Sequence, residues 1–200
     1  RHRLLGECFE ELMSQLNTEE NNLLINQSTQ DWEHRCSGRG SLPPTSAAYI
    51  ECELLNKRWE NLKSTLNELG PCRKKALLSN GATEEILWVG KYVVVVALGK
   101  LKAKTAMSGW LTHLLVCEHD KAPTATLVIA RSSSIRKQDR FETVLKWNRL
   151  PATKARNELN KLKAIAFRGL QNCWPVPPES GWALAMASKK DPKKGIKAFQ

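Results

Sequence analysis

The sequence predicts a mainly α-helical N-terminal part, followed by a C-terminal part that is either a small basic α+β unit or unstructured. Three observations support this prediction. Apolar residues with heptad spacing run from position 48 to 69, Lys and Arg predominate after residue 80, and strand-like apolar runs lie between 86 and 130. We therefore divide the chain into residues 1–76 and residues 77–200.

The first predicted helix begins at Leu4 and ends near Trp32. Its apolar residues Leu5, Phe9, Leu12 and Leu16 are spaced by four, three and four positions, which is typical of one buried helix face. The segment 37–44 contains two glycines and two adjacent prolines, and it ends this helix.

The second predicted helix covers residues 46–69, with Thr45 or Ser46 as its N-cap and Gly70-Pro71 as its end. Seven apolar residues alternate by four and three positions along it, which indicates a narrow stripe buried against other helices. They are Ala48, Cys52, Leu55, Trp59, Leu62, Leu66 and Leu69. We interpret Trp59 as a core aromatic residue and not as an anchor for a partner.

The segment Leu55-Asn56-Lys57-Arg58-Trp59-Glu60-Asn61-Leu62 resembles the third helix of a spectrin repeat, closest to the version in dystrophin- and utrophin-like linkers. The stretch from Gly38 to Leu42 resembles the loop before that helix. This resemblance covers residues 4–76 and implies the second and third helices of a three-helix bundle. The structural core would then comprise Phe9, Leu12, Leu16, Cys52, Leu55, Trp59, Leu62 and Leu66.

The same resemblance implies a function. It is that of a non-enzymatic cytoskeletal spacer or scaffold, located in the cytoplasm at the cytoskeleton. The partners that it implies are cytoskeletal or membrane-associated proteins, including actin. Because the chain begins at Arg1 without an initiator Met, we expect it to be a fragment of a longer protein.

The second region contains four candidate strands and two candidate helices. The strands are predicted at 86–89, 92–98, 110–116 and 124–130, from β-branched and aromatic residues between turn signals. One helix is predicted from Ser134 to Pro151 and holds Phe141, Val144, Leu145 and Trp147; the next covers 152–170. The tail from Trp174 onward reads as a loop, and the basic run 189–194 reads as disordered.

A different interpretation of this region starts from Gly90-Lys91-Tyr92. A splice-donor sequence would give these three residues if it were translated. On that interpretation, residues beyond about 90 are read-through of non-coding sequence and have no evolved fold.

The charge distribution supports an alternative function. Residues 1–80 carry ten Lys or Arg against eleven Asp or Glu, whereas residues 81–200 carry twenty-one against nine. A basic surplus attracts phosphate backbones, so the alternative is a nucleic-acid-binding α+β module in residues 86–170. The lysines of this region show no recognisable stripe along the sequence.

The sequence contains few candidates for chemistry. His113, Cys117 and His119 are spaced so that they could share one face, but no second cluster completes a familiar zinc set, and we expect no metal site. We find no phosphate-binding loop or nucleophile motif and expect no enzyme activity and no cofactor. The six scattered cysteines favour a reducing compartment, and no apolar run reaches membrane-spanning length.

Overall fold

The computed structural model describes residues 6, 38, 40, 46–79, 82–118, 123–134, 139–171 and 178–190. The chain divides into two compact units whose segments alternate along the sequence. The first unit comprises Arg1–Lys100 and Pro123–Arg149, and the second comprises Leu101–Ala122 and Leu150–Gln200.

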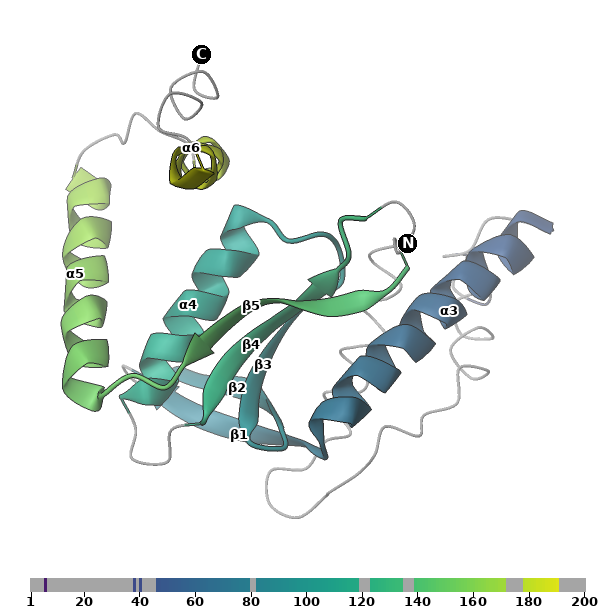
Figure 1. Ribbon diagram of the computed structural model, residues 1–200, viewed down its shortest axis with the longest axis horizontal. Helices are drawn as coiled ribbons and strands as arrows, with labels where there is room; N and C mark the ends of the chain where they lie inside the picture. Colours follow the sequence, from purple (N-terminus) through teal and green to yellow (C-terminus); the bar gives the residue numbers. More distant parts are fainter. Residues whose placement is uncertain are drawn as a thin grey trace. The chain divides into compact units, whose positions relative to one another are not determined.

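A five-stranded mixed sheet forms the centre of the first unit (Figure 1). Its strands are β1 (Cys72–Ser79), β2 (Ala82–Val89), β3 (Tyr92–Ala97), β4 (Ala125–Arg131) and β5 (Phe141–Asn148), in that spatial order. All neighbouring strands are antiparallel except β3 and β4, which are parallel. A parallel pair needs a long crossover connection, and the segment that makes it contains a helix.

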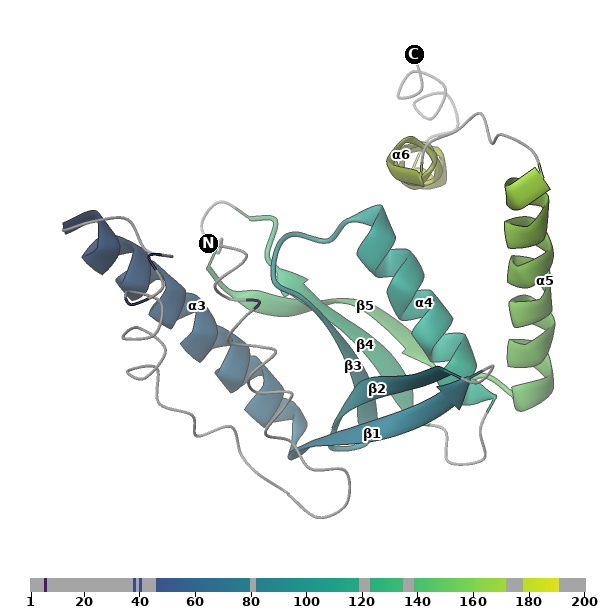
Figure 2. The same cartoon turned by 180° about the vertical axis from the view of Figure 1, so that it is seen from behind.

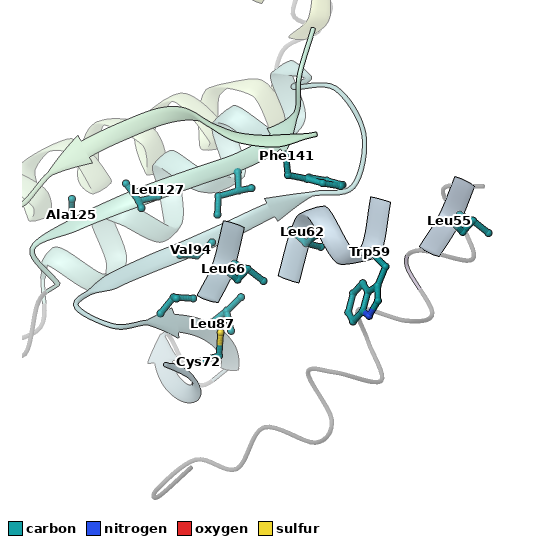
Figure 3. Packing of buried hydrophobic residues seen from close by; sticks show 12 residues of the cluster. Leu55, Trp59, Leu62, Leu66, Cys72, Leu87, Val94, Ala125, Leu127 and Phe141 are labelled. Carbon is teal, nitrogen blue, oxygen red and sulfur yellow. The ribbon is translucent and has the colours of Figure 1, made fainter. Parts of the chain in front are cut away.

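Helix α3 (Ser46–Leu69) packs on one face of this sheet. Figure 3 shows Leu66 close to Leu87 and Cys72 of the strands, and Leu55, Trp59 and Leu62 belong to the same buried cluster. The strand residues in the same buried cluster are Cys72, Leu87, Val89, Val94, Ala125, Leu127, Ile129 and Phe141. The heptad stripe of α3 therefore forms the hydrophobic core between one helix and one sheet face.

Two glycines fix the corner between α3 and the β2–β3 hairpin. Gly90 has φ 56°, and a Cβ atom at this position would lie 2.5 Å from the Leu69 carbonyl oxygen. The Gly90 amide donates a hydrogen bond to the Pro71 carbonyl oxygen at 2.9 Å. Gly70 has φ 125°, and its own added Cβ would lie 3.1 Å from the Gly90 Cα. Only glycine permits this approach of the two backbones.

The second unit contains helices α4 (Ala103–Cys117), α5 (Ala152–Gln171) and α6 (Pro178–Lys190). Figures 1 and 2 show α5 beside α4. Leu114 and Cys117 of α4 share a buried cluster with Ala155 and Leu159 of α5. Among the described helices of both units, none is long and apolar enough to cross a membrane.

The prediction of a mainly α-helical bundle is wrong, because the fold is α+β with a five-stranded sheet. A heptad stripe shows that a helix buries one narrow face, and the partner here is a sheet. The predicted division after residue 76 falls inside β1. The helix expected from Leu4 to about Trp32, with Phe9, Leu12 and Leu16, lies outside the described residues except at residue 6.

Three other element predictions are also wrong. Residues 110–116 belong to helix α4, and the helix predicted after Ser134 is strand β5 from Phe141 onward. Residues 178–190, predicted as loop, form helix α6. The read-through interpretation is wrong as well. The segment after residue 90 supplies three of the five strands, and it contributes buried residues to the same core as α3.

Candidate nucleic-acid interface

Helix α5 carries a concentrated positive charge on an exposed surface. Its twenty residues include five Lys or Arg and a single acidic residue, Glu158. Ala155 and Leu159 are buried, whereas all five basic residues are exposed. The helix is therefore held to its unit by one apolar face, and its cations point to solvent.

Three of these cations form a stripe, which we call the α5 stripe: Lys154, Lys161 and Arg168. They are seven residues apart, so they lie on nearly the same side of the helix. At 1.5 Å per residue, successive cations are about 10.5 Å apart along the helix axis. This stripe was not predicted, although the seven-residue repeat of basic residues is visible in the sequence.

Two ion pairs on α5 limit how its charges are arranged. Lys161 Nζ lies 2.7 Å from Glu158 Oε1, one turn away on the same helix. Arg156 Nε lies 2.8 Å from Glu118 Oε1 and links α5 to the end of α4. Arg156 lies outside the α5 stripe, and its ion pair is within the second unit. The five basic side chains of α5 still outnumber the two carboxylates that pair with them, Glu158 and Glu118.

A second basic surface lies on edge strand β1 of the first unit. The Nζ atom of Lys75 is 4.2 Å from the centre of the Trp88 ring, and the guanidinium carbon of Arg73 is 5.6 Å from it. Lys74, which alternates with them, forms an ion pair with Glu85 of β2. Trp88 is buried, so it cannot stack on a base. The contacts of this cluster stabilise the edge of the sheet by cation–π interaction.

The residues considered for metal binding lie on α4, where the structure places two of the three. The Cys117 Sγ atom is 3.7 Å from His113 Nδ1 and accepts a hydrogen bond from the Leu150 amide at 3.5 Å. Both side chains are buried, and burial lowers the pKa of His113 from its usual value. His119 lies outside the described residues. Within those residues, no group of three His, Cys, Asp or Glu is placed to hold a metal ion.

The residues of α3 that were predicted to lie in the core differ in burial. Leu55, Trp59, Leu62 and Leu66 are buried in the core of the first unit, and Cys52 is half-buried beside it. The prediction did not include Cys72, which is fully buried in the same cluster. Burial raises the pKa of the Cys72 thiol to about 11, so the thiol stays protonated at neutral pH.

A comparison with known protein families matches residues 1–189 to the RecC C-terminal domain. The match covers nearly the whole chain, across both units. The chain belongs to the RecC C-terminal domain family. A comparison with curated proteins finds none that matches this chain.

Membership in the RecC family overturns the spectrin-repeat resemblance. The segment from Leu55 to Leu62 is part of an amphipathic helix with a buried Trp, and such helices occur in many folds. The predicted cytoskeletal spacer function, the actin-binding role and the cytoskeletal location are therefore wrong for this RecC domain. Nucleic acid, the alternative partner predicted from the basic second region, is consistent with the family.

Proposed function

We propose that this chain is a DNA-binding domain of RecC and that the α5 stripe contacts the phosphate backbone. RecC is a component of a DNA-repair helicase–nuclease. The single observation that carries the proposal is the exposed run of Lys154, Lys161 and Arg168 along one side of α5. Lys and Arg contacts to phosphates displace counterions and bind without regard to base sequence.

The dimensions of α5 suit this role. A helix of twenty residues is about 30 Å long, and the three cations divide most of that length evenly. Ala155 and Leu159 anchor its first half in the second unit, which holds the stripe in a fixed register. A rigid row of cations loses less side-chain and backbone entropy on binding than a flexible tail does.

The proposed role is one of binding only. In this proposal the chain positions DNA, and it contributes no catalytic group to the chemistry. Incubation of the chain with duplex DNA and Mg²⁺ should therefore return the duplex uncut. Cleavage that disappears in an α5 variant would contradict this part of the proposal.

Salt-dependent binding of a fluorescein-labelled duplex tests the α5 stripe. The variant combines Lys154→Gln, Lys161→Gln and Arg168→Gln in the full chain. If each residue neutralises one phosphate, the slope of log Kd against log salt should fall by about 0.9 for each residue lost. The affinity should fall by a similar factor for duplexes of different sequence.

The matched control removes the same charge from the first unit, through Lys57→Gln, Lys91→Gln and Lys146→Gln. All three residues are exposed, and none lies on α5. We expect this control to retain most of the wild-type slope. Equal losses in the two triple variants would mean that net charge alone attracts the DNA, and the interface on α5 would be rejected.

A further inference from the structure

The carboxyl end of β4 holds an arginine whose backbone is fixed on both sides. The Arg131 amide donates to the Gly99 carbonyl oxygen at 2.9 Å, just beyond the end of β3. The next amide, that of Ser132, donates to the Arg140 carbonyl oxygen at 2.8 Å. Strand pairing therefore continues to the last residue of β4, and the start of the Arg131 side chain has a defined position.

The Arg131 side chain lies on the same face of the sheet as α3. Arg131 pairs with Phe141 in the β4–β5 ladder, and directly opposed residues have their side chains on one face. Phe141 belongs to the core under α3. Arg131 is only half-buried, so its guanidinium has access to solvent as well as to this core edge.

The Arg131 guanidinium has an unmet requirement for an acceptor. Its Nε atom is buried, and no hydrogen-bond acceptor reaches it among the described residues. A buried donor without a partner costs free energy, and a charged donor costs more than a neutral one. Such an atom in a native fold calls for an explanation, and the binding of an anion is one.

The carboxylate that precedes β5 already has a partner. Asp139 lies two residues before Phe141, and its Oδ1 accepts from Arg58 Nε at 2.9 Å. Arg58 is buried and draws this carboxylate toward α3. Two arginines therefore lie near this end of the sheet, Arg58 of α3 and Arg131 of β4. The Asp139 carboxylate is paired with Arg58.

We propose that Arg131 binds a phosphate group at the carboxyl end of β4. A phosphate supplies the oxygen acceptor that Nε lacks, and the planar guanidinium suits bidentate contact with an oxyanion. The Gly99 carbonyl oxygen accepts the hydrogen bond of the Arg131 amide, and the next residue, Lys100, is exposed. Lys100 therefore provides a second cation close to Arg131 in the structure. Ser133 and Ser134 are exposed and directly follow the buried Ser132. Their hydroxyls can donate to the same phosphate.

The phosphate can come from a DNA backbone or from the free anion, and the two sources are separable. The DNA source rests on the proposed function, whereas binding of free phosphate does not. Two measurements on the full chain cover both. One is the rise in melting temperature caused by inorganic phosphate relative to chloride at equal ionic strength. The other is the salt slope of duplex binding.

The test variant is Arg131→Gln, which removes the charge but keeps a polar side chain. We expect it to lose the phosphate-specific rise in melting temperature. Duplex affinity should fall roughly tenfold, the size expected for one charge-assisted hydrogen bond. The salt slope should fall by about 0.9. Arg131→Lys keeps the charge without the planar fork and should give intermediate losses.

The control is Arg149→Gln, which removes the same charge from the opposite end of the same sheet. Arg149 is exposed, and its amide bonds Thr124, just before β4 begins. If Arg131→Gln and Arg149→Gln behave alike in both measurements, the phosphate site is rejected. A loss of the phosphate response with an unchanged duplex slope supports the site with free phosphate as its ligand. If the α5 variant binds duplex normally while Arg131→Gln does not, the α5 interface fails and this site stands.

Discussion

Arg58 and Asp139 form a largely buried ion pair between residues 81 positions apart in the sequence. The Arg58 Nε atom lies 2.9 Å from Asp139 Oδ1, and the two side chains are 7% and 15% exposed. Arg58 comes from the middle of α3, and Asp139 lies just before β5. The pair therefore joins helix α3 to the residues that lead into strand β5.

Removing one partner of this pair should be costly. Arg58→Met or Asp139→Leu leaves the other charge buried and unpaired, and we expect each to lower the free energy of unfolding by about 3–5 kcal/mol. The double variant should lose much less than the sum, because it leaves no unpaired charge. Urea unfolding of all four proteins gives the coupling energy. The exposed pair Lys161–Glu158 is the control, and Lys161→Met should cost no more than about 1 kcal/mol. Strict additivity of the two buried substitutions would contradict the pairing.

Trp59 should contribute strongly to the stability of the first unit. Its side chain is 3% exposed and lies in the cluster between α3 and the sheet. We expect Trp59→Ala to lower the free energy of unfolding by about 3–5 kcal/mol, because it removes a large buried surface and leaves a cavity. Glu53→Ala, at an exposed position of the same helix, should cost little. Similar midpoints in urea for these two variants would show that the indole is not packed as described.

Gly90 should not tolerate any side chain. Gly90→Ala combines a left-handed φ with a Cβ placed 2.5 Å from the Leu69 carbonyl oxygen, and we expect a loss of at least about 2 kcal/mol. Gly90→Asn separates the two causes, because Asn accepts a left-handed φ but still has a Cβ. It should be nearly as destabilised as Gly90→Ala in thermal unfolding. An Asn variant as stable as wild type would mean that the close contact of a Cβ at position 90 with the Leu69 carbonyl oxygen is easily relieved.

His113 should make the stability depend on pH on the acid side of neutrality. Burial lowers its pKa in the folded chain below the ordinary value of 6.5, so the unfolded chain binds more protons in that range. The contribution of neutral His113 to the free energy of unfolding is therefore complete above about pH 6.5. It is lost as the pH falls toward the pKa of His113 in the folded chain. We expect His113→Gln to flatten the fall of melting temperature between neutral and mildly acidic pH. An acid slope equal to that of wild type would assign the effect to other groups.

The sequence predicts some elements correctly and others incorrectly, and the cause differs in each case. The helix ending at Leu69 and the helix after Ala152 follow clear helical periodicity, and the structure contains both. Residues 110–116 were predicted as strand because a short apolar run does not distinguish a buried helix from a buried strand. Strand β5 was missed because Val144 has no partner in β4, and this bulge interrupts the alternation of its side chains.

Strand β1 shows a different cause of error. Its three consecutive cations, Arg73, Lys74 and Lys75, resemble charges at the end of a helix, yet lysines are also typical of edge strands. The dipeptide Asn80-Gly81 lies between Ser79 and Ala82, which pair across β1 and β2. It is a strong hairpin signal. The fold class was missed because the partner of the α3 stripe is set by residues distant in the sequence.

The candidate site was only partly accessible from the sequence. The basic character of the second region was evident, and it led to nucleic acid as the alternative partner. The α5 stripe needs only the helical repeat to be seen, so it was within reach. Arg131 was not, because neither its buried Nε nor the pairing of Asp139 with Arg58 leaves a local pattern in the sequence.

The alternation of the two units along the chain has a consequence for how the protein can be divided. The segment between β3 and β4 belongs to the second unit, while β4 and β5 return to the first. No single truncation can therefore isolate either unit intact. A protease that nicks the chain between residues 118 and 123 would leave β4 attached to β3 only by ladder hydrogen bonds and side-chain packing. The two halves should then copurify, and neither should refold when expressed alone.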